Sequence, residues 1–505
     1  MTSTHVTHEI EPVYDKNSRV LLLGTMPSPK SRETGFFYGH PQNRFWKVLA
    51  LLFDEPTPET IEEKRDLCLR HRIALWDVLS SCDIEGASDA SIKNAKPNDL
   101  AQILNAAPIQ AVFTTGTKAG QLYKKLCEPV TSIPCTVLPS TSPANSRVSL
   151  AELCTTYKQA LSPYLDFNPE YPVLDVPEVV RLEKSIASSG TSLYTLMHRA
   201  GRFLAYEAKK YLDQKSDCRE SDRNIAKPKE SKCNGTKHNE SGCSEINRHE
   251  PENSKTASEQ NQFLATIPNR LHVSILCGHG NNGGDGWVAA DYLAKAGYHV
   301  DLISSVSAQE IKAEPAHTTA CEIEHEIKCE IERETECEIE CQSEHETEHK
   351  TKQEIERKSK DKRGRKIAGS PKNKQTIHLL INPTNEEVEA SLSKADLIID
   401  AILGTGFSGD TVREPFSTWI ELANQQKAHE EVRDTDHLAC STRNARIIAA
   451  DVASGFSAQT GTAAKPCIMA DHTVTMITLK TGLVQSSAKT YCGTIRVAPL
   501  AVFDL

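Results

Sequence analysis

Apolar and aromatic residues are scarce in this sequence. Hydrophobic residues make up 38% of the 505 residues and aromatic residues 6%, whereas an ordinary globular chain carries about 45–50% apolar residues. Part of the chain is therefore not expected to belong to a packed core. No stretch approaches the roughly 20 apolar residues of a membrane helix, and the beginning of the sequence lacks the apolar run of a secretory signal. These absences predict a cytoplasmic protein with no membrane partner.

A general excess of basic charge is also missing. The chain has 58 Lys and Arg against 68 Asp and Glu, a net charge of −10, which argues against a protein that binds polyanions over its whole surface. Any contact with nucleic acid must then come from a local group of cations. The 16 cysteines stand in a chain without a secretory signal, so we expect reduced thiols rather than a disulfide framework.

Two stretches account for the missing apolar content. Residues 214–262 contain no Leu, Val, Phe, Tyr or Trp, and residues 308–374 contain an acidic repeat whose copies begin at Cys321, Cys329 and Cys337. Neither stretch can bury enough apolar surface to offset the entropy of ordering it, so we predict two disordered low-complexity insertions. What remains suits two domains, residues 1–165 and residues 170–505, the second interrupted by both insertions.

The acidic repeat raises a metal-binding hypothesis. Structural zinc ligands usually pair two to four residues apart, and only Cys337 and Cys341 approach that spacing. Low-complexity filler is therefore the preferred interpretation, and the basic run at 358–366 is interpreted as a solvated tail rather than a localisation signal. The other residues that a metal site would use are Cys321, Cys329, His325, His345 and His349.

The first domain alternates buried-strand patterns with helical ones, which predicts an α/β sheet. Functional loops of such sheets lie beyond the carboxyl ends of the strands. The loops after Leu23, Trp76, Thr115 and Leu138 are therefore expected to meet at one edge. The apolar spacing from Phe45 to Leu52 predicts a helix. The expected strands are residues 19–24, 73–79, 111–116 and 135–138.

Ring faces, amide edges and cations are close together in these loops, a combination that fits an extruded nucleobase between its flanking phosphates. For Phe45 and Trp46 the alternative is that they pack the helix into the core. The aromatic residues are Phe36, Phe37, Tyr38, Phe45 and Trp46. The polar residues are Asn43, Asp77, Thr141, Ser142 and Asn145, and the cations are Arg32, Arg44, Lys47 and Arg147.

Three segments in this order resemble the uracil-DNA glycosylase superfamily, and within it the hypoxanthine (deoxyinosine) DNA glycosylase branch. They are GTMPSPKSRETGFFYGHPQNRFW (24–46), ALWDVLSSCDIEGASDASIKN (74–94) and LPSTSPANS (138–146). The resemblance covers almost all of residues 15–165. It implies a three-layer α/β/α fold around a mainly parallel sheet. It also implies metal-independent hydrolysis of the N-glycosidic bond of a deaminated base, hypoxanthine or uracil, in damaged DNA.

The same resemblance implies roles for individual residues. Asn43 would be catalytic, orienting the attacking water or supporting charge while the sugar becomes cationic. Thr25 and Met26 would line the base pocket, and Phe37 or Tyr38 would stack on the base. The loop that holds Ser142 and Asn145 would approach the extruded nucleotide. Thr114 and Thr115 depart from the family pattern, where an Asn usually precedes the Gly, so the preferred base stays open.

The second domain begins with a helical pattern over 177–212, followed by strand, Gly-rich turn, helix and strand between 271 and 304. Two more strands end at Asp400 and at Asp451, each before another Gly-containing turn. Glycines let a backbone approach a ligand and point its N–H groups at a phosphate. Three such turns at the ends of successive strands predict one nucleotide-binding edge.

Oxygen-bearing side chains lie at the same strand ends. Asn282, Asp400 and Ser454 together suit a hard cation, although each alone is more often a turn former or a helix cap. The segments GHGNNGGDG, DAILGTGFSGD, ADVASG and ADHTVTMITLKTGL resemble the NAD(P)H-hydrate epimerase (YjeF N-terminal domain) family, and LMHRAG resembles its N-terminal helix. The resemblance implies a Rossmann-like α/β/α fold, usually as a homodimer, and epimerisation of R-NAD(P)HX to S-NAD(P)HX.

Carried over to this sequence, the resemblance implies that K⁺ is bound by Asn282, Asp400 and Ser454 and that Asp451 does the acid–base work beside the hydrated ring. Ala453 replaces the usual Pro of the DxxSG turn. The residues implied to contact NAD(P)HX, besides Asp451, are Asn281, Asn282, Gly283, Gly284, Asp285, Gly404, Thr405, Gly406, Phe407, Ser408, Gly409 and Asp410.

The combined prediction is a fusion of a deaminated-base DNA glycosylase with an NAD(P)H-hydrate epimerase. Two alternatives of another class stay open. The C-terminal half would instead be a nucleotide-sensing module without catalysis, or the N-terminal half would be a DNA-binding scaffold only.

Overall fold

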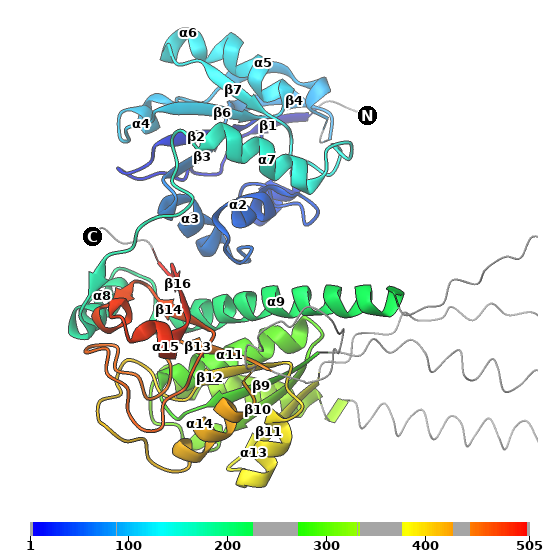
Figure 1. The fold of residues 1–505 in the computed structure, drawn as a ribbon. Coiled ribbons are helices and arrows are strands. Elements are labelled where there is room, and N and C mark those ends of the chain that lie inside the picture. Colours follow the sequence, from blue (N-terminus) through cyan, green and yellow to red (C-terminus); the bar gives the residue numbers. More distant parts are fainter. Residues whose placement is uncertain are drawn as a thin grey trace, which may run out of the picture. The chain divides into compact units, whose positions relative to one another are not determined.

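The computed structural model describes residues 4–86, 88–225, 271–330, 332–333, 376–427 and 445–501. The chain separates into two compact units. The first holds residues 1–206 with 475–484 and 497–505, and the second holds residues 207–474 with 485–496. Two parallel sheets with helices on both faces form the centres of the fold (Figure 1). Among the described helices, none combines the length and the apolar character that crossing a membrane requires.

The first sheet has four parallel strands in the order β3-β2-β6-β7. Every residue of β2 and β3 is buried, because helices cover both faces and the strand sequences are apolar without alternation. The predicted strands and their parallel arrangement are confirmed. The strands are β2 (Val20–Gly24), β3 (Ile73–Asp77), β6 (Ala111–Thr115) and β7 (Cys135–Leu138). The helices are α1 (Pro29–Thr34), α2 (Phe45–Phe53), α3 (Ile61–Arg70), α4 (Ala101–Leu104), α5 (Thr117–Leu126), α6 (Glu128–Thr131) and α7 (Leu150–Leu161).

A small antiparallel sheet, which the sequence did not predict, adjoins the end of β3. Its order is β1-β4-β5, with β1 (Thr4–Thr7), β4 (Leu79–Ile84) and β5 (Lys93–Pro97). Only Val78 separates β3 from β4, and the N–H of His8 donates to the carbonyl of Ser80 at 2.7 Å. The N-terminal strand is thereby held beside the carboxyl end of β3.

The second sheet has seven strands in the order β11-β10-β9-β12-β13-β14-β16. The chain runs outward from β9 to β11 and then returns to β12 on the other side of β9, so the strand order reverses between β9 and β12. The strands are β9 (His272–Cys277), β10 (His299–Ser304), β11 (Thr376–Ile381), β12 (Leu397–Ala401), β13 (Arg446–Ala450), β14 (His472–Met476) and β16 (Thr494–Ala498).

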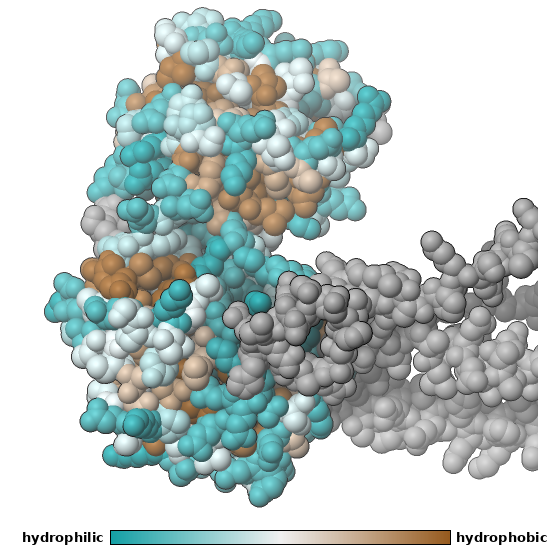
Figure 2. All heavy atoms as spheres, in the orientation of Figure 1, coloured by the Kyte–Doolittle hydropathy of each residue, from teal (hydrophilic) through white to brown (hydrophobic). Residues whose placement is uncertain are grey.

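Helices cover the faces of this sheet with their apolar sides inward. In α13 (Asn385–Leu392), Val388 and Leu392 are buried one turn apart, and the outer side of the helix is hydrophilic in Figure 2. The other helices of the sheet are α11 (Asn281–Lys295), α14 (Phe416–Gln425) and α15 (Ala488–Cys492). The remaining elements are β8 (Val173–Leu174), which pairs with β15 (Leu479–Lys480), α8 (Val176–Ser188) and α9 (Leu193–Ile225).

The structure corrects the start of both predicted insertions. Helix α9 continues to Ile225, past residue 214. Residues 316–330 are helical as well, with Ile323 and Ile327 buried. The isoleucines of the repeat lie four residues apart, so a helix aligns them into an apolar stripe that packs on the core. Residues 226–262 and 334–374, with Cys337, Cys341, His345, His349 and the basic run, lie outside the described residues.

Candidate functional sites

A cleft of about 830 Å³ opens where the four parallel strands of the first sheet end. Gly24, Asp77, Thr115 and Ser140 line it, each at or just beyond the end of a different strand. The predicted meeting of these loops at one edge is therefore confirmed. The cleft is also lined by the residues to which the sequence analysis assigned catalysis or base contact, namely Thr25, Met26, Phe37, Tyr38, Asn43, Ser142 and Asn145.

Asn43 is held by its amide oxygen. The Oδ1 atom accepts from the N–H of Phe45 at 3.0 Å and from the hydroxyl of Thr141 at 2.8 Å. Both partners are donors, so this atom is the oxygen and the nitrogen is the other amide terminus. The Nδ2 group makes no hydrogen bond to any described residue and is left as a donor at the wall of the cleft.

Arg44 braces the loop on the opposite wall instead of lying free for a phosphate. Its guanidinium donates to the carbonyls of Asn145, at 2.8 Å, and of Val148. The side chain of Asn145 in turn donates to the carbonyl of Ser140 at 2.8 Å. The expectation that Arg44 is one of the phosphate-facing cations is thus corrected, because charge-assisted bonds to backbone carbonyls already occupy it. Lys47 and Arg147 are exposed.

The aromatic residues divide between core and cleft. Phe45 and Trp46 are buried in the core, as the alternative interpretation had it. Tyr38 stacks on Phe45 with ring centroids 3.8 Å apart, so only its other face is open to a ligand. Its hydroxyl lies 2.9 Å from the hydroxyl of Thr115. Burial, with the nearby carboxylate of Asp77, raises the pKa of Tyr38 well above its usual value, so the phenol stays neutral.

Two carboxylates line the cleft, and of these Asp77 is buried whereas Asp89 is exposed. Asp77 Oδ2 is 2.9 Å from Nε2 of His8, with 7% and 1% of the two side chains exposed. The hydroxyl of Thr25 donates to Asp89 at 2.9 Å. Partial desolvation of its carboxyl group in the cleft raises the pKa of Asp89, and the charge of Asp77 adds to this effect. The sequence analysis named Asp77 without giving it a role and did not name His8, because no local pattern links residues 69 positions apart.

In the second sheet, the residues predicted to bind a cation converge on Leu403. Ser454 Oγ is 2.5 Å from Asp400 Oδ1, and the Ser454 N–H donates to Asp400 Oδ2 at 2.8 Å. The backbone of Leu403 joins this pair to the third residue. Its N–H donates to Ser454 Oγ at 2.8 Å, and its carbonyl accepts from Asn282 Nδ2 at 3.0 Å. The three side chains therefore surround one point between the loops that follow β9, β12 and β13.

This point is buried and acidic. Asp400 and Ser454 are fully buried, and burial raises the pKa of Asp400 to about 6, even though hydrogen bonds from Ser454 and Ile402 favour the ionised form. Asn282 Oδ1 is buried and has no hydrogen-bond partner among the described residues. A buried oxygen without a donor beside a buried carboxylate is the arrangement that a cation would complete.

Glycines bring the loops of this edge into contact. A Cβ atom at Gly278 would lie 2.0 Å from the carbonyl oxygen of Ile402, and one at Gly283 would lie 1.9 Å from the carbonyl oxygen of Gly278. Helix α11 begins at Asn281, so its free N–H groups lie in the Gly-rich turn, where an anion is stabilised.

The other predicted contacts of this edge vary in exposure. Asp285 is buried in the first turns of α11, whereas Gly406, Ser408, Gly409 and Asp410 are exposed in the loop after β12. Asp451 follows β13 directly and has a positive φ of 62°, a conformation held by the hydrogen bond from its N–H to the carbonyl of Val474 at 2.7 Å.

Among the described residues, the structure shows no group of three or more His, Cys, Asp or Glu side chains that could hold a metal. This includes Cys321 and Cys329 of the acidic repeat.

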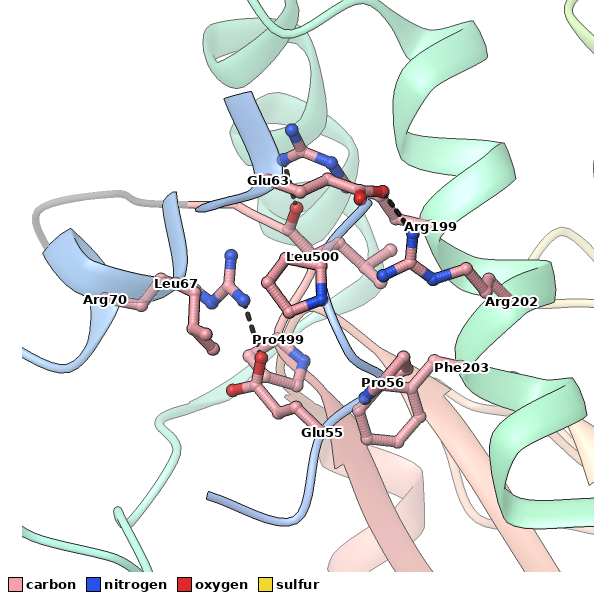
Figure 3. Close-up of a pocket in the computed structure, with 11 residues that line it drawn as sticks. Glu55, Pro56, Glu63, Leu67, Arg70, Arg199, Arg202, Phe203, Pro499 and Leu500 are labelled. Atoms are coloured by element: carbon pink, nitrogen blue, oxygen red, sulfur yellow. Dashed lines mark hydrogen bonds and ion pairs between the residues drawn. The ribbon is translucent and has the colours of Figure 1, made fainter. Parts of the chain in front are cut away.

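A third cluster of charges lies in a smaller pocket of the first unit. Arg70 and His71 both contact the buried carboxylate of Glu55 at 2.6 Å, and Figure 3 shows Arg70 directed at Glu55. Burial alone would raise the pKa of Glu55, but the charge of Arg70 and the hydrogen bond from His71 outweigh it and hold the pKa at about 2. His71 also stacks on Phe53 at 3.5 Å. We assign this cluster to the stability of the fold.

The two folds define a class of protein, with two α/β domains whose loops meet at the carboxyl ends of parallel strands. Comparison with known proteins identifies both. Residues 11–162 match the model of the uracil DNA glycosylase superfamily, and residues 254–482 match that of the YjeF-related protein N-terminus. The chain belongs to the uracil DNA glycosylase superfamily through its N-terminal part and carries a YjeF-related domain in its C-terminal part.

Curated relatives match each part separately. Hypoxanthine DNA glycosylase of Methanosarcina acetivorans is 34% identical over 139 residues, which cover 27% of this chain and 87% of that protein. NAD(P)H-hydrate epimerase of Pirellula staleyi is 27% identical over 241 residues, covering 48% of this chain and 77% of that protein. The bifunctional NAD(P)H-hydrate repair enzyme Nnr of Escherichia coli is 27% identical over 238 residues, covering 47% of this chain and only 32% of that protein.

Proposed function

We propose that the chain is a double repair enzyme. Residues 1–165 would remove a deaminated base, hypoxanthine or uracil, from DNA, and residues 170–505 would epimerise R-NAD(P)HX to S-NAD(P)HX. The observation that supports the first activity is the cleft of about 830 Å³, in which the predicted residues lie together. Its volume lies in the range of small-ligand pockets, which suits one extruded base.

Asn43 is the proposed catalytic residue of the first activity. Its oxygen is occupied by Phe45 and Thr141, so the amide meets the substrate as a donor through Nδ2. A donor at this place would hold the oxygen of the attacking water or support charge on the leaving base. The transition state is cationic at the sugar, so electrostatic support and positioning suffice without a strong base. Thr25, Met26, Ser142, Asn145 and one ring of Phe37 or Tyr38 are the proposed base and DNA contacts.

The test uses duplexes that contain hypoxanthine, uracil or xanthine, followed by alkaline cleavage of abasic sites. We expect the full chain to release one of these bases, and Asn43→Ala to lower the single-turnover rate by about 10²–10³-fold while binding of abasic-site DNA stays within about threefold. A DNA-binding scaffold would give no product in either protein. No product from folded wild-type protein with any base would contradict this half of the proposal.

The second activity is supported by the meeting of Asn282, Asp400 and Ser454 around Leu403, at the point where the strand order reverses. The Gly-rich start of α11 would take the phosphates of NAD(P)HX, together with the loop 404–410. Asp451, at the same edge, is the proposed acid–base residue next to the hydrated nicotinamide ring.

The residues at this edge fit a potassium ion. The buried Oδ1 of Asn282 without a donor, the carboxylate of Asp400, Ser454 Oγ and the carbonyl of Leu403 are oxygen ligands of the kind that hard cations take. The ion would supply positive charge that offsets the negative charge of the Asp400 carboxylate, and it would hold the three loops together. Asp400 and Ser454 position these loops, and Asn282 holds the start of α11.

The epimerase is tested by following pure R-NADHX as it converts to the S form, by chromatography, in KCl and in a chloride salt of a large organic cation. We expect turnover that needs K⁺ and a loss of about 10²–10⁴-fold in kcat for Asp451→Asn, with the KM little changed. A nucleotide-sensing module would bind NADHX and show no turnover above the uncatalysed rate, and that result would overturn this assignment.

The proposal extends to assembly and location. A homodimer formed through the epimerase domain is part of the proposal. Sedimentation velocity of the full chain tests it. A cytoplasmic location is also part of the proposal, because ten of the cysteines in the described part of the chain are free thiols.

A further inference from the structure

Asp77 lines the cleft of the first sheet and is paired with a buried histidine, His8, and the chemistry proposed for Asn43 uses neither residue. The ring of His8 is 1% exposed and is packed 6.1 Å from the rings of Phe37 and Trp76. The Ile10 N–H donates to Nδ1 of His8 at 3.3 Å, so Nδ1 accepts and the ring proton is on Nε2. His8 therefore donates to Asp77 Oδ2 at 2.9 Å and has no free atom for a ligand.

The other oxygen of Asp77 is kept open. Oδ1 makes no hydrogen bond to the described residues, and Asp77 lines the cleft. Gly24 provides the space, because a Cβ atom there would lie 2.2 Å from this oxygen. The backbone of Asp77 is fixed as well, since Asn98 donates to its carbonyl at 3.0 Å. Asp77 Oδ1 is thus a preorganised acceptor on the wall of a base-sized cleft.

A carboxylate acceptor selects for the product of deamination. Adenine has a lone pair at N1, which a carboxylate repels, and deamination converts that edge to the N1–H and 6-oxo group of hypoxanthine. Uracil has the same pair of groups, N3–H beside a carbonyl, where cytosine has a lone pair. A site that must satisfy a buried polar group discriminates far more strongly than one that relies on shape.

We propose that Asp77 determines specificity by accepting the N–H of the lactam edge of a deaminated base, with His8 as the residue that positions its carboxylate. This inference rests on the proposed glycosylase activity and names the chemical feature by which that site would recognise its base.

The experiment uses the full chain, wild type and Asp77→Asn, in two measurements. The first is single-turnover excision of hypoxanthine and uracil from duplex DNA. The second is binding of uncleavable duplexes that contain 2′-fluoro-deoxyinosine or 2′-fluoro-deoxyadenosine at the same position. We expect Asp77→Asn to lower excision by about 100-fold and to bring the inosine-to-adenosine affinity ratio close to one.

His8 is tested with a matched pair of variants. His8→Gln keeps a side-chain N–H donor for Asp77 and is expected to retain excision and the affinity ratio within about threefold. His8→Phe keeps an aromatic ring between Phe37 and Trp76 and loses the donor, so we expect a loss of about 10-fold in both. A purely packing role of His8 would give the opposite order.

The outcomes are separable. If wild-type protein excises no deaminated base, the proposed function fails and this inference fails with it. If wild-type protein is active and Asp77→Asn keeps its rate, or loses rate with the affinity ratio unchanged, only the recognition role of Asp77 is overturned. Should Asp77→Asn fail to fold, wild-type protein is compared on 2′-fluoro duplexes with hypoxanthine and 1-methylhypoxanthine. Equal affinity for both bases would overturn the proposal, because the second lacks the N–H.

Discussion

At the scale of single residues, burial decides which charges matter for stability. Glu55 is 4% exposed and contacts Arg70 and His71 at 2.6 Å each, whereas the pair of Lys30 and Glu33 is largely exposed. Exposed ion pairs contribute little to the free energy of unfolding, but removing one partner of a buried ion pair leaves an uncompensated buried charge. The cluster around Glu55 joins the end of α2 to the end of α3.

The pH dependence of stability follows from Glu55. Its pKa falls from 4.5 to about 2 on folding, so its contribution is complete above about pH 4.5 and is lost as the pH falls from 4.5 towards 2. We expect Glu55→Gln to lower the free energy of unfolding by about 3 kcal/mol at pH 7 and by far less near pH 2.5. Urea denaturation at the two pH values measures this.

The matched control for this experiment is Glu33→Gln, which removes an exposed partner and is expected to change stability by less than about 0.5 kcal/mol at both pH values. An equal loss for Glu55→Gln at pH 7 and pH 2.5 would show that packing, rather than charge, accounts for its contribution.

At the scale of elements, the start of α11 depends on glycine for space rather than for a special backbone angle. Gly283 has no room for a Cβ atom, which would lie 1.9 Å from the carbonyl oxygen of Gly278, whereas a Cβ at Gly280 meets nothing within 4 Å. Neither residue has a positive φ. The two positions of one turn therefore differ only in how closely backbone approaches backbone.

We expect Gly283→Ala to displace the start of α11, to lower stability by about 2 kcal/mol or more, and to abolish NADHX turnover. Gly280→Ala is the control, with stability within about 0.5 kcal/mol of wild type. Thermal denaturation and nucleotide binding of the two variants test this. Equal destabilisation would mean that the loop relaxes around either methyl group.

At the scale of the whole molecule, the two sheets do not share strands, so the two activities are expected to be separable. A break between residues 165 and 170 keeps β8 with its partner β15 and leaves α9 whole. A break at residue 206, the boundary of the compact units, divides α9 and parts β8 from β15.

We expect fragments 1–168 and 169–505 to retain base excision and epimerisation, respectively, within about threefold of the full chain. A fragment that begins at residue 207 is expected to be inactive, because it lacks β8 and the first turns of α9. Activity assays of the separately purified fragments check both. A large loss in fragment 169–505 would indicate that the epimerase fold needs the preceding domain.

Much of the fold was predictable because its signals are local. Apolar runs such as residues 19–24 lie within a few residues of the observed strand β2, and the Gly-rich turn at 278–286 marks the switch from β9 to α11. The residues of both sites were predictable as members of motifs. The helix over 316–330 was missed, because the repeat was interpreted from its acidic composition and not from the helical spacing of Ile323 and Ile327.

The sequence by itself determined the two α/β domains, the loops at the strand ends and the side chains available there, because hydrophobic period and glycine placement are properties of neighbouring residues. Only the tertiary structure decided what those side chains do. In the folded chain, Arg44 donates to the carbonyl of Asn145, and Asn43 Oδ1 accepts from Thr141. Leu403 links Asn282 to Ser454, and His8 is hydrogen-bonded to Asp77. Each of these contacts joins residues far apart in the chain, and only the packing of the sheets brings them within hydrogen-bond distance.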